Sequence, residues 1–189
     1  NMKLKTFNYT AKYYLPKGKY LESIVGVQGM YQKNSNYGEE LLIPNASTQD
    51  FGVFATANYE KNKHTFQAGL RYDYRNINTI THGIANEEGY FAGIDKKFKS
   101  INGSLGYKTE WKKNTIVRLN VASGFRAPNL AELTSNGVHE GSNRYEKGNN
   151  DLKNEQNLQT DINIEYRNPH FELFVNGFYN RINNYIYIA

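Results

Sequence analysis

Cysteine is absent from this chain of 189 residues, and so is any long apolar run. The lack of cysteine excludes a disulfide framework, cysteine-based zinc sites and a thiol nucleophile. No apolar stretch approaches the roughly 18 to 20 residues that a transmembrane helix needs. A helix that spans a bilayer is therefore not expected.

The chain also lacks a concentrated charge of one sign. Lys and Arg number 23 against 18 Asp and Glu, which gives a formal net charge of +5. A nucleic-acid-binding domain gathers its basic residues on one face or in a known module, whereas here they are spread along the whole length. Nucleic acid is not an expected partner.

Signatures of enzymes are missing too. The sequence contains no G-x-S-x-G, H-E-x-x-H or paired-carboxylate signature, and its four histidines, at positions 64, 82, 139 and 170, lie in different segments. We therefore expect no enzyme and no catalytic residues, no cofactor is indicated, and a set of metal ligands is not identified.

Aromatic residues and alternation are what the chain has in abundance. The aromatic content of 14% favours a folded chain over a disordered one. Residues 64–75 alternate with a period of two, which places successive side chains on opposite faces of a sheet. One face is apolar and the other is charged, with Phe66, Ala68, Leu70, Tyr72 and Tyr74 opposite Arg71, Asp73 and Arg75.

The same pattern recurs and predicts about eight long strands. These cover residues 3–15, 19–33, 51–60, 64–75, 98–111, 115–122, 157–167 and 171–181. Further charged residues occupy the polar face of two of these strands, namely Arg118, Asp161 and Glu165.

Connections of two lengths join the predicted strands. Short segments rich in turn residues lie at 16–18, 61–63, 112–114 and 168–170, and long polar connections lie at 34–50, 77–97 and 123–156. The order strand, short turn, strand, long loop repeats, and no linker divides the chain. The predicted fold is all-β, one antiparallel up-and-down meander over residues 1–189.

Strand length distinguishes a soluble sandwich, a soluble ligand-binding barrel and an outer-membrane barrel. Strands of globular proteins run about five or six residues, whereas these run about 10 to 14, close to the tilted length that crosses a bilayer. Transmembrane barrels also carry aromatic girdles, short periplasmic turns and longer outer loops. Tyr59 and Trp111 lie near short turns, and Phe51 and Tyr74 near long loops. We expect part of a larger transmembrane β-barrel.

Three stretches carry a family resemblance. Residues 123–128 read Ser-Gly-Phe-Arg-Ala-Pro, and residues 148–155 read Gly-Asn-Asn-Asp-Leu-Lys-Asn-Glu before an alternating strand. Residues 176–182 read Asn-Gly-Phe-Tyr-Asn-Arg-Ile. In this order they resemble the C-terminal half of the β-barrel of TonB-dependent outer-membrane receptors. Asn150 and Asn154 stand where that family often has proline.

The resemblance implies a partial barrel, because barrels of this family have about 22 strands. The plug domain, signal peptide and closing strands are expected to be absent from residues 1–189. It implies a receptor of the Gram-negative outer membrane that binds a scarce nutrient (a siderophore, a metal or another metal chelate) and imports it with energy relayed by TonB. The expected partners are the TonB energising complex, reached through the missing plug, the small-molecule or metal-chelate ligand, and outer-membrane lipid.

Candidate substrate-binding residues lie in the long loops. They are His139, Glu140, Arg144 and Tyr145 in the third loop, and His82 in the second. His and carboxylate side chains can ligate a metal, and Arg or Tyr can hold an anionic chelate. The alternative interpretation is that all five are solvated loop residues.

Charged residues of the polar face form a second candidate set. Arg71, Asp73, Arg75, Arg118, Asp161 and Glu165 are expected to line the lumen, where a plug can contact them through salt bridges. The alternative is the ordinary interior polarity of a water-filled barrel.

Two other functions stay open at this point. The first is a small outer-membrane barrel that acts as an adhesin or anchor, since eight strands suffice to close a narrow barrel. The second is a soluble carbohydrate-binding β-domain, which predicts a monomer without detergent. The transported substrate and the position of these strands in a full barrel are not assigned by the sequence.

Overall fold

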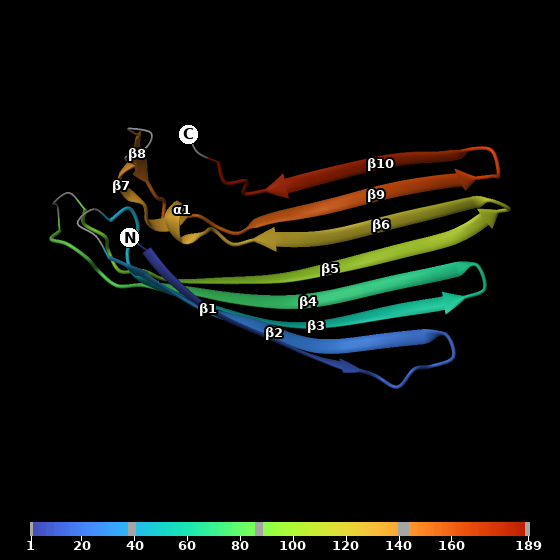
Figure 1. Ribbon diagram of the computed structural model, residues 1–189, viewed down its shortest axis with the longest axis horizontal. Coiled ribbons are helices and arrows are strands. Elements are labelled where there is room, and N and C mark those ends of the chain that lie inside the picture. Colours follow the sequence, from blue (N-terminus) through green and yellow to red (C-terminus); the bar gives the residue numbers. More distant parts are fainter. Residues whose placement is uncertain (1, 38–40, 86–88, 140–143, 188–189) are drawn as a thin grey trace.

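The computed structural model describes residues 2–37, 41–85, 89–139 and 144–187. Within them the chain forms one eight-stranded antiparallel sheet in the order β1-β2-β3-β4-β5-β6-β9-β10 (Figure 1). The strands are β1 (Met2–Tyr14), β2 (Leu21–Asn36), β3 (Ala46–Lys61), β4 (His64–Thr79), β5 (Asp95–Lys112), β6 (Thr115–Arg126), β9 (Glu155–Arg167) and β10 (Glu172–Asn183). Each strand pairs with the next long strand along the chain, which confirms the predicted meander of long strands.

Asparagine shapes two of the short turns. Asn62 and Asn114 adopt positive φ angles of 57° and 68°. Asparagine tolerates this left-handed conformation better than most residues, because its short side chain can hydrogen-bond locally. The turns therefore hold the tight registers Lys61↔His64 and Lys112↔Thr115.

The third loop contains regular structure that the sequence analysis did not identify. The helix α1 (Leu130–Thr134) follows β6 closely, and β7 (Asn136–His139) pairs with β8 (Arg144–Lys147) as a separate two-stranded sheet. These elements lie beside the end of the large sheet where the long loops gather (Figure 1). None of the helices in the described residues is long and apolar enough to cross a membrane.

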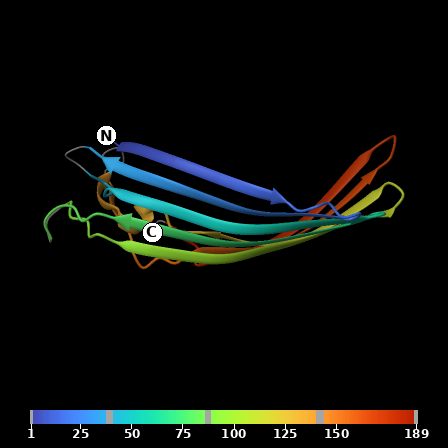
Figure 2. The ribbon, with the colours of Figure 1, turned by 90° about the horizontal axis from the view of Figure 1, so that it is seen from below.

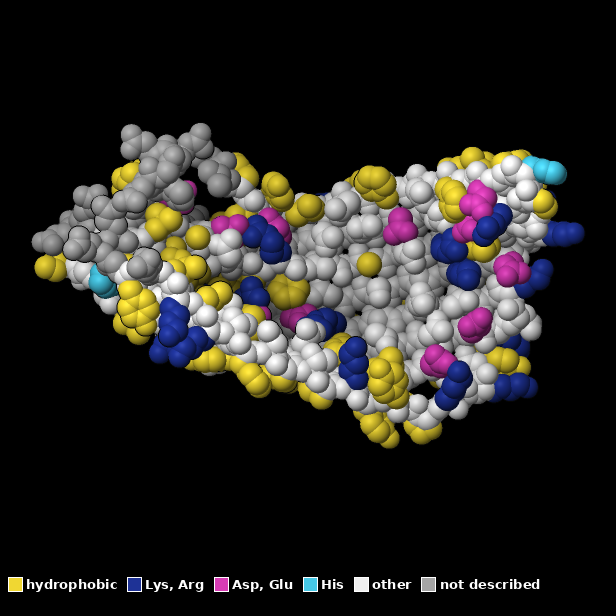
Figure 3. Space-filling view, in the orientation of Figure 1, with side chains coloured by type: hydrophobic (Ala, Val, Ile, Leu, Met, Phe, Trp, Pro, Cys, Tyr) yellow, Lys and Arg dark blue, Asp and Glu magenta, His cyan; other side chains and the backbone are white. Residues whose placement is uncertain are grey.

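The large sheet is curved like a trough (Figure 2). Its two faces differ in chemistry. Figure 3 looks onto the concave face, which shows polar and charged side chains with apolar ones mainly at the margins. The convex face carries the apolar set, as in the exposed side chains of Leu70, Ile101 and Leu105. Cross-strand pairing places the apolar residues of β4 and β5 on the same face, because Tyr72 pairs with Ile101 and Ala68 pairs with Leu105.

This polarity reverses at the long-loop end of the sheet. Ile77 continues the alternating series of Arg71, Asp73 and Arg75, yet it is only 2% exposed. It packs in a cluster with Phe98, Ala127 and Leu133, the last of which comes from α1. The only core cluster found among the described residues thus lies at the loop end, inside the curve of the sheet.

Candidate functional site

A hollow on the concave face gathers the charged residues of β3 and β4. Arg75 donates two hydrogen bonds to Asp50, from Nε to Oδ1 and from Nη2 to Oδ2, both at 2.6 Å. Arg71 donates from Nε to both carboxylate oxygens of Asp73, at 2.7 and 2.8 Å, and from Nη1 to the Gln28 side chain at 3.1 Å. These residues line a concavity of about 500 Å³. Bidentate geometry makes such ion pairs directional.

Gly52 allows this close packing. A Cβ atom at position 52 would lie 2.5 Å from Nη2 of Arg71 and 2.7 Å from Oδ1 of Asp73. The guanidinium of Arg71 also lies 5.8 Å from the centre of the Phe54 ring, within cation–π range. The absence of a side chain at Gly52 therefore leaves the space that the ion pair fills.

A second polar group lies on the concave face of β6 and β9. Nη1 of Arg118 donates to Asn163 and to Glu165, both at 2.8 Å, and Asn120 donates to Asp161 at 2.8 Å. All six predicted lumen residues thus occupy the concave face. Each has a polar partner on the sheet itself, so their charges are partly balanced within the described residues.

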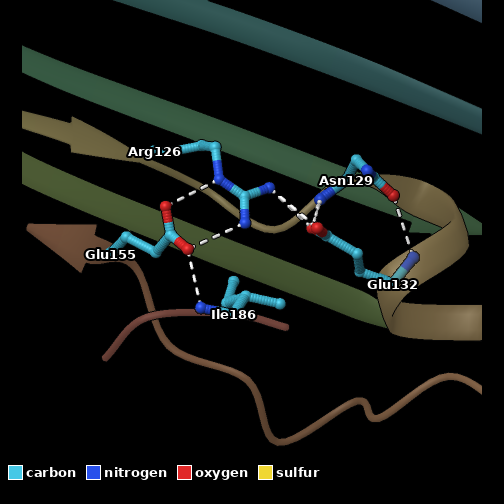
Figure 4. Close-up of polar contacts among 5 residues, drawn as sticks. All are labelled: Arg126, Asn129, Glu132, Glu155 and Ile186. Atoms are coloured by element: carbon cyan, nitrogen blue, oxygen red, sulfur yellow. Dashed lines mark hydrogen bonds and ion pairs between the residues drawn. The ribbon is translucent and has the colours of Figure 1, made fainter. Parts of the chain in front are cut away.

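Arg126 joins three parts of the chain at the loop end (Figure 4). It donates from Nε and Nη2 to the two oxygens of Glu155, at 2.8 and 2.9 Å. Its Nη1 donates to both oxygens of Glu132 in α1, also at 2.8 and 2.9 Å. Glu155 further accepts the backbone N–H of Ile186, beyond β10, at 2.6 Å. One guanidinium therefore ties β6 to β9 and to the helix.

Glu132 also takes part in capping the start of α1. The Asn129 side chain accepts the Glu132 N–H at 2.8 Å, and the Glu132 carboxylate accepts the Asn129 N–H at 2.8 Å. This reciprocal capping box satisfies two backbone donors that a helix start leaves free. The same carboxylate thus serves the cap and the ion pair, which fixes α1 against the end of β6.

The Arg126 group lies beyond the apolar band of the convex face. At the loop end, the last exposed apolar residue of that band is Val121 on β6 and Leu158 on β9. Hydrogen bonds from Arg126, joined by the Ile186 N–H, lower the pKa of the Glu155 carboxyl from 4.5 to about 2. In turn the two carboxylates raise the pKa of Arg126, so the group stays charged across the physiological range.

Asn136 brings the three long loops together. Its backbone N–H donates to the carbonyl of Leu42 at 3.4 Å, and its side-chain amide donates to the carbonyl of Tyr90 at 2.9 Å. The Tyr145 hydroxyl donates to the Asn136 side-chain oxygen at 2.7 Å. The hairpin of β7 and β8 is thereby fixed to the first and second loops.

The structure places the five candidate loop residues unevenly. Tyr145 is 56% exposed on β8, beside Asn136. His82 is exposed and forms an isolated bridge with Phe91. His139 and Arg144 form the last backbone pair of the hairpin, and their side chains are outside the described set. Glu140 lies outside the described residues. No group of three or more His, Cys, Asp or Glu within the described part is placed to hold a metal ion.

Several residues of these groups escaped the sequence analysis. Asp50, Glu132, Glu155 and Asn136 were not candidates, although they complete the main polar networks. The Asn-x-x-Glu spacing of residues 129–132 is a capping-box pattern and was the available signal for α1. Nothing local marks the partners from distant strands, because only the sheet register brings them together.

Comparison with known proteins identifies the architecture. Residues 5–189 match the family described as TonB dependent receptor-like, beta-barrel. No curated protein sequence matches the chain.

Three solved structures with a similar fold are named as transporters or receptors. The chain is similar to the copper transporter OprC (TM-score 0.75, 16% identity, 96% of this chain and 30% of that chain). It is similar to the Serratia marcescens hemophore receptor HasR, solved with its hemophore HasA and heme (0.74, 18%, 97% and 34%). It is also similar to the FrpB iron transporter of Neisseria meningitidis (0.71, 15%, 96% and 28%). It therefore spans about a third of the length of these proteins.

Proposed function

The chain belongs to the TonB-dependent receptor-like β-barrel family, and from this premise we propose that it forms part of an outer-membrane receptor that imports a scarce nutrient. The observation that carries the proposal is the division of the sheet into an apolar convex face and a polar concave face. In a transmembrane barrel the first faces lipid and the second faces the lumen. The expected location is the outer membrane of a Gram-negative cell.

The proposed cargo is a metal-bearing nutrient, namely a siderophore, a metal or another metal chelate. Three structures of the same fold are named for copper, heme and iron, which supports this class without selecting one member. We assign the first contacts with the cargo to the long loops, through Tyr145 and His82 together with His139, Glu140 and Arg144. Import is proposed to need TonB, acting through a plug domain.

The concave ion pairs are the proposed contact surface for that plug. Arg71, Asp73, Arg75, Arg118, Asp161 and Glu165 lie on the face that a barrel encloses. Their partly exposed charges leave hydrogen-bonding capacity on the lumen side. A plug domain would dock against these residues by placing carboxylates near the arginines and basic side chains near the aspartates and the glutamate.

Uptake measurements test the proposal. Strains with and without the full-length gene are grown under metal limitation. Ferric catecholate or heme is supplied as the only iron source, or a copper salt as the only copper source. We expect one source to support growth only when both the gene and TonB are present. Growth on every source without the gene, or undiminished uptake without TonB, would refute the proposed import.

A loop variant then tests the cargo contacts. Tyr145→Phe removes the hydroxyl that reaches Asn136, and His82→Ala removes an exposed imidazole from the second loop. The double variant is expected to raise the cargo concentration needed for half-maximal uptake several-fold. Lys113→Gln, at a short turn on the opposite end, serves as the control.

One observation weighs against the small closed barrel. Such a barrel pairs its first strand with its last, whereas β1 and β10 stand at opposite edges of the sheet in the described residues. A heat-modifiable outer-membrane band of roughly 70 to 110 kDa, the size expected for about 22 strands and a plug, supports the receptor. A product of about 22 kDa supports the small barrel if it is in the membrane, and a soluble domain if it is not.

A further inference from the structure

A row of four aromatic rings crosses the convex face beside the short turns. Tyr20 lies 6.2 Å from Tyr59, Tyr59 lies 6.4 Å from Phe66, and Phe66 lies 4.8 Å from Tyr107, measured between ring centres. The rings run from Tyr20, just before β2, across β3 and β4 to β5. This aromatic row marks the level at which apolar side chains give way to polar ones.

Two ammonium groups lie over one end of the aromatic row. Nζ of Lys19 is 5.1 Å and Nζ of Lys61 is 5.5 Å from the centre of the Tyr20 ring. Both distances are within cation–π range, so each ammonium group lies near the Tyr20 ring. The ion pairs of the described residues include neither lysine, whereas Lys17 in the same turn pairs with Glu22.

Acidic residues at this level belong to the other face. Glu60 alternates with Tyr59 and Lys61, and Glu22 pairs with Asn58 in the same concave series. Positive charge is therefore left on the convex side, next to the aromatic row. At the opposite end of the row, Nδ1 of His64 lies 2.8 Å from the Tyr107 hydroxyl.

An apolar furrow begins directly at the aromatic row. Ala57 and Ala68 are paired across β3 and β4, and their small side chains leave a depression between Leu105 and the rings. The depression has a volume of about 400 Å³ and an almost entirely apolar lining. It crosses from β3 to β6 on the side of the row that faces the middle of the sheet, and its lining includes Leu119 and Val121.

We propose that this surface binds one anionic phospholipid from the leaflet at the short-turn end. The phosphate lies between Lys19 and Lys61, the glycerol region crosses the aromatic row, and an acyl chain occupies the furrow at Ala57 and Ala68. Charge complementarity selects an anionic headgroup, and the furrow selects a lipid over a free anion. The inference rests on the membrane location proposed above, but not on the cargo or on TonB.

Lipid retention by the full-length protein tests this inference. The protein is purified in detergent from outer membranes and offered equal amounts of phosphatidylglycerol and phosphatidylcholine, and bound lipids are counted by native mass spectrometry. We expect one phosphatidylglycerol to be retained preferentially. Removing both charges with Lys19→Gln and Lys61→Gln should weaken its retention roughly tenfold or more, since each lysine near an anionic surface contributes substantially to binding.

Two matched variants separate charge from shape. Lys33→Gln with Lys99→Gln removes two exposed lysines at the loop end and should leave retention unchanged. Ala68→Phe fills the furrow and should weaken phosphatidylglycerol and phosphatidylcholine alike, while the gel shift on heating confirms that the barrel is folded. Inorganic phosphate should fail to displace the bound lipid.

Three results would overturn the inference. These are equal retention of the two lipids, an unchanged preference in the Lys19 and Lys61 variant, and displacement by inorganic phosphate. A folded, heat-modifiable barrel without lipid preference removes the lipid site alone. A product that never enters the membrane removes the proposed location as well, so the two failures are distinguishable.

Discussion

The two ends of β4 follow one alternating series and place opposite chemistry on the same face. On the concave side, Arg71 and Asp73 form a polar pair, and a few residues later Ile77 is nearly inaccessible. On the convex side, Leu70 is exposed, and Asn78 takes the equivalent position toward the loops. What changes along the strand is the surroundings of the side chains, because α1 packs against the loop end, whereas the rest of the convex face is the part proposed to contact lipid.

The two ends of β4 also differ in how side-chain packing stabilises the fold. In the part proposed to span the membrane, apolar side chains face outward and are expected to stabilise the protein only when lipid or detergent covers them. At the loop end, Ile77, Phe98 and Leu133 form an inner cluster like that of a soluble protein. The loop end is therefore expected to contribute most of the packing stability that does not depend on the bilayer.

Truncating the inner cluster should have the largest effect. Ile77→Ala is expected to destabilise the full-length protein by about 3 kcal/mol, because it removes buried methyl groups and leaves a cavity. Ile101→Ala on the convex face, where the side chain is 70% exposed in the described chain, should cost less than Ile77→Ala, because detergent fills the space and no cavity is left. Urea midpoints in detergent measure both, and equal costs would contradict the comparison.

A charge placed on the convex face should have the next largest effect. Leu105→Arg is expected to cost about 2 to 3 kcal/mol in a bilayer, because the guanidinium must enter the apolar band. The control is Gln67→Arg on the concave face of β4, which should be nearly neutral. Folding titrations in lipid vesicles compare them, and a costly Gln67→Arg would mean that the two faces are assigned wrongly.

Loss of the Arg126 ion pairs should be intermediate. Arg126→Ala is expected to cost about 1 to 2 kcal/mol at neutral pH, since charge-assisted hydrogen bonds are lost but the group is partly exposed. Arg126→Lys should retain part of this stability, because lysine keeps the charge without the planar geometry.

The pH dependence of this effect has a definite sign. The pKa of Glu155 is lowered to about 2 in the folded protein, so its contribution is complete above about pH 4.5 and is lost as pH falls toward 2. The stability difference between the wild type and Arg126→Ala should therefore shrink over this interval. Unfolding midpoints measured at several pH values test it, and a difference that grows on acidification would contradict the assignment.

The smallest expected effect concerns the cap of α1. Asn129→Ala removes the acceptor for the Glu132 N–H and should cost about 0.5 to 1 kcal/mol, confined to the loop end. Asn129→Ser keeps a capping oxygen and should be close to the wild type. Hydrogen exchange at residues 130–134 reports the change, while exchange in the middle of β4 should stay the same.

The sequence predicted the sheet better than the site. Period-two alternation and turn residues such as Asn62 and Asn114 are local signals, so the number and order of the long strands followed from them. The ends of the strands were less accurate. Strand β3 begins at Ala46 and β6 runs to Arg126, because backbone pairing with β2 and β9 continues into the loop end.

The partners of the charged residues came only from the tertiary structure. Arg126 meets Glu155 because β6 lies beside β9, although 29 positions separate the two residues. Asp50 meets Arg75, and Arg118 meets Glu165, for the same reason. Alternation determines which face a side chain takes, since it depends on the backbone alone. Register and curvature decide which side chains meet and which face encloses the lumen, because both depend on strands that are distant in sequence.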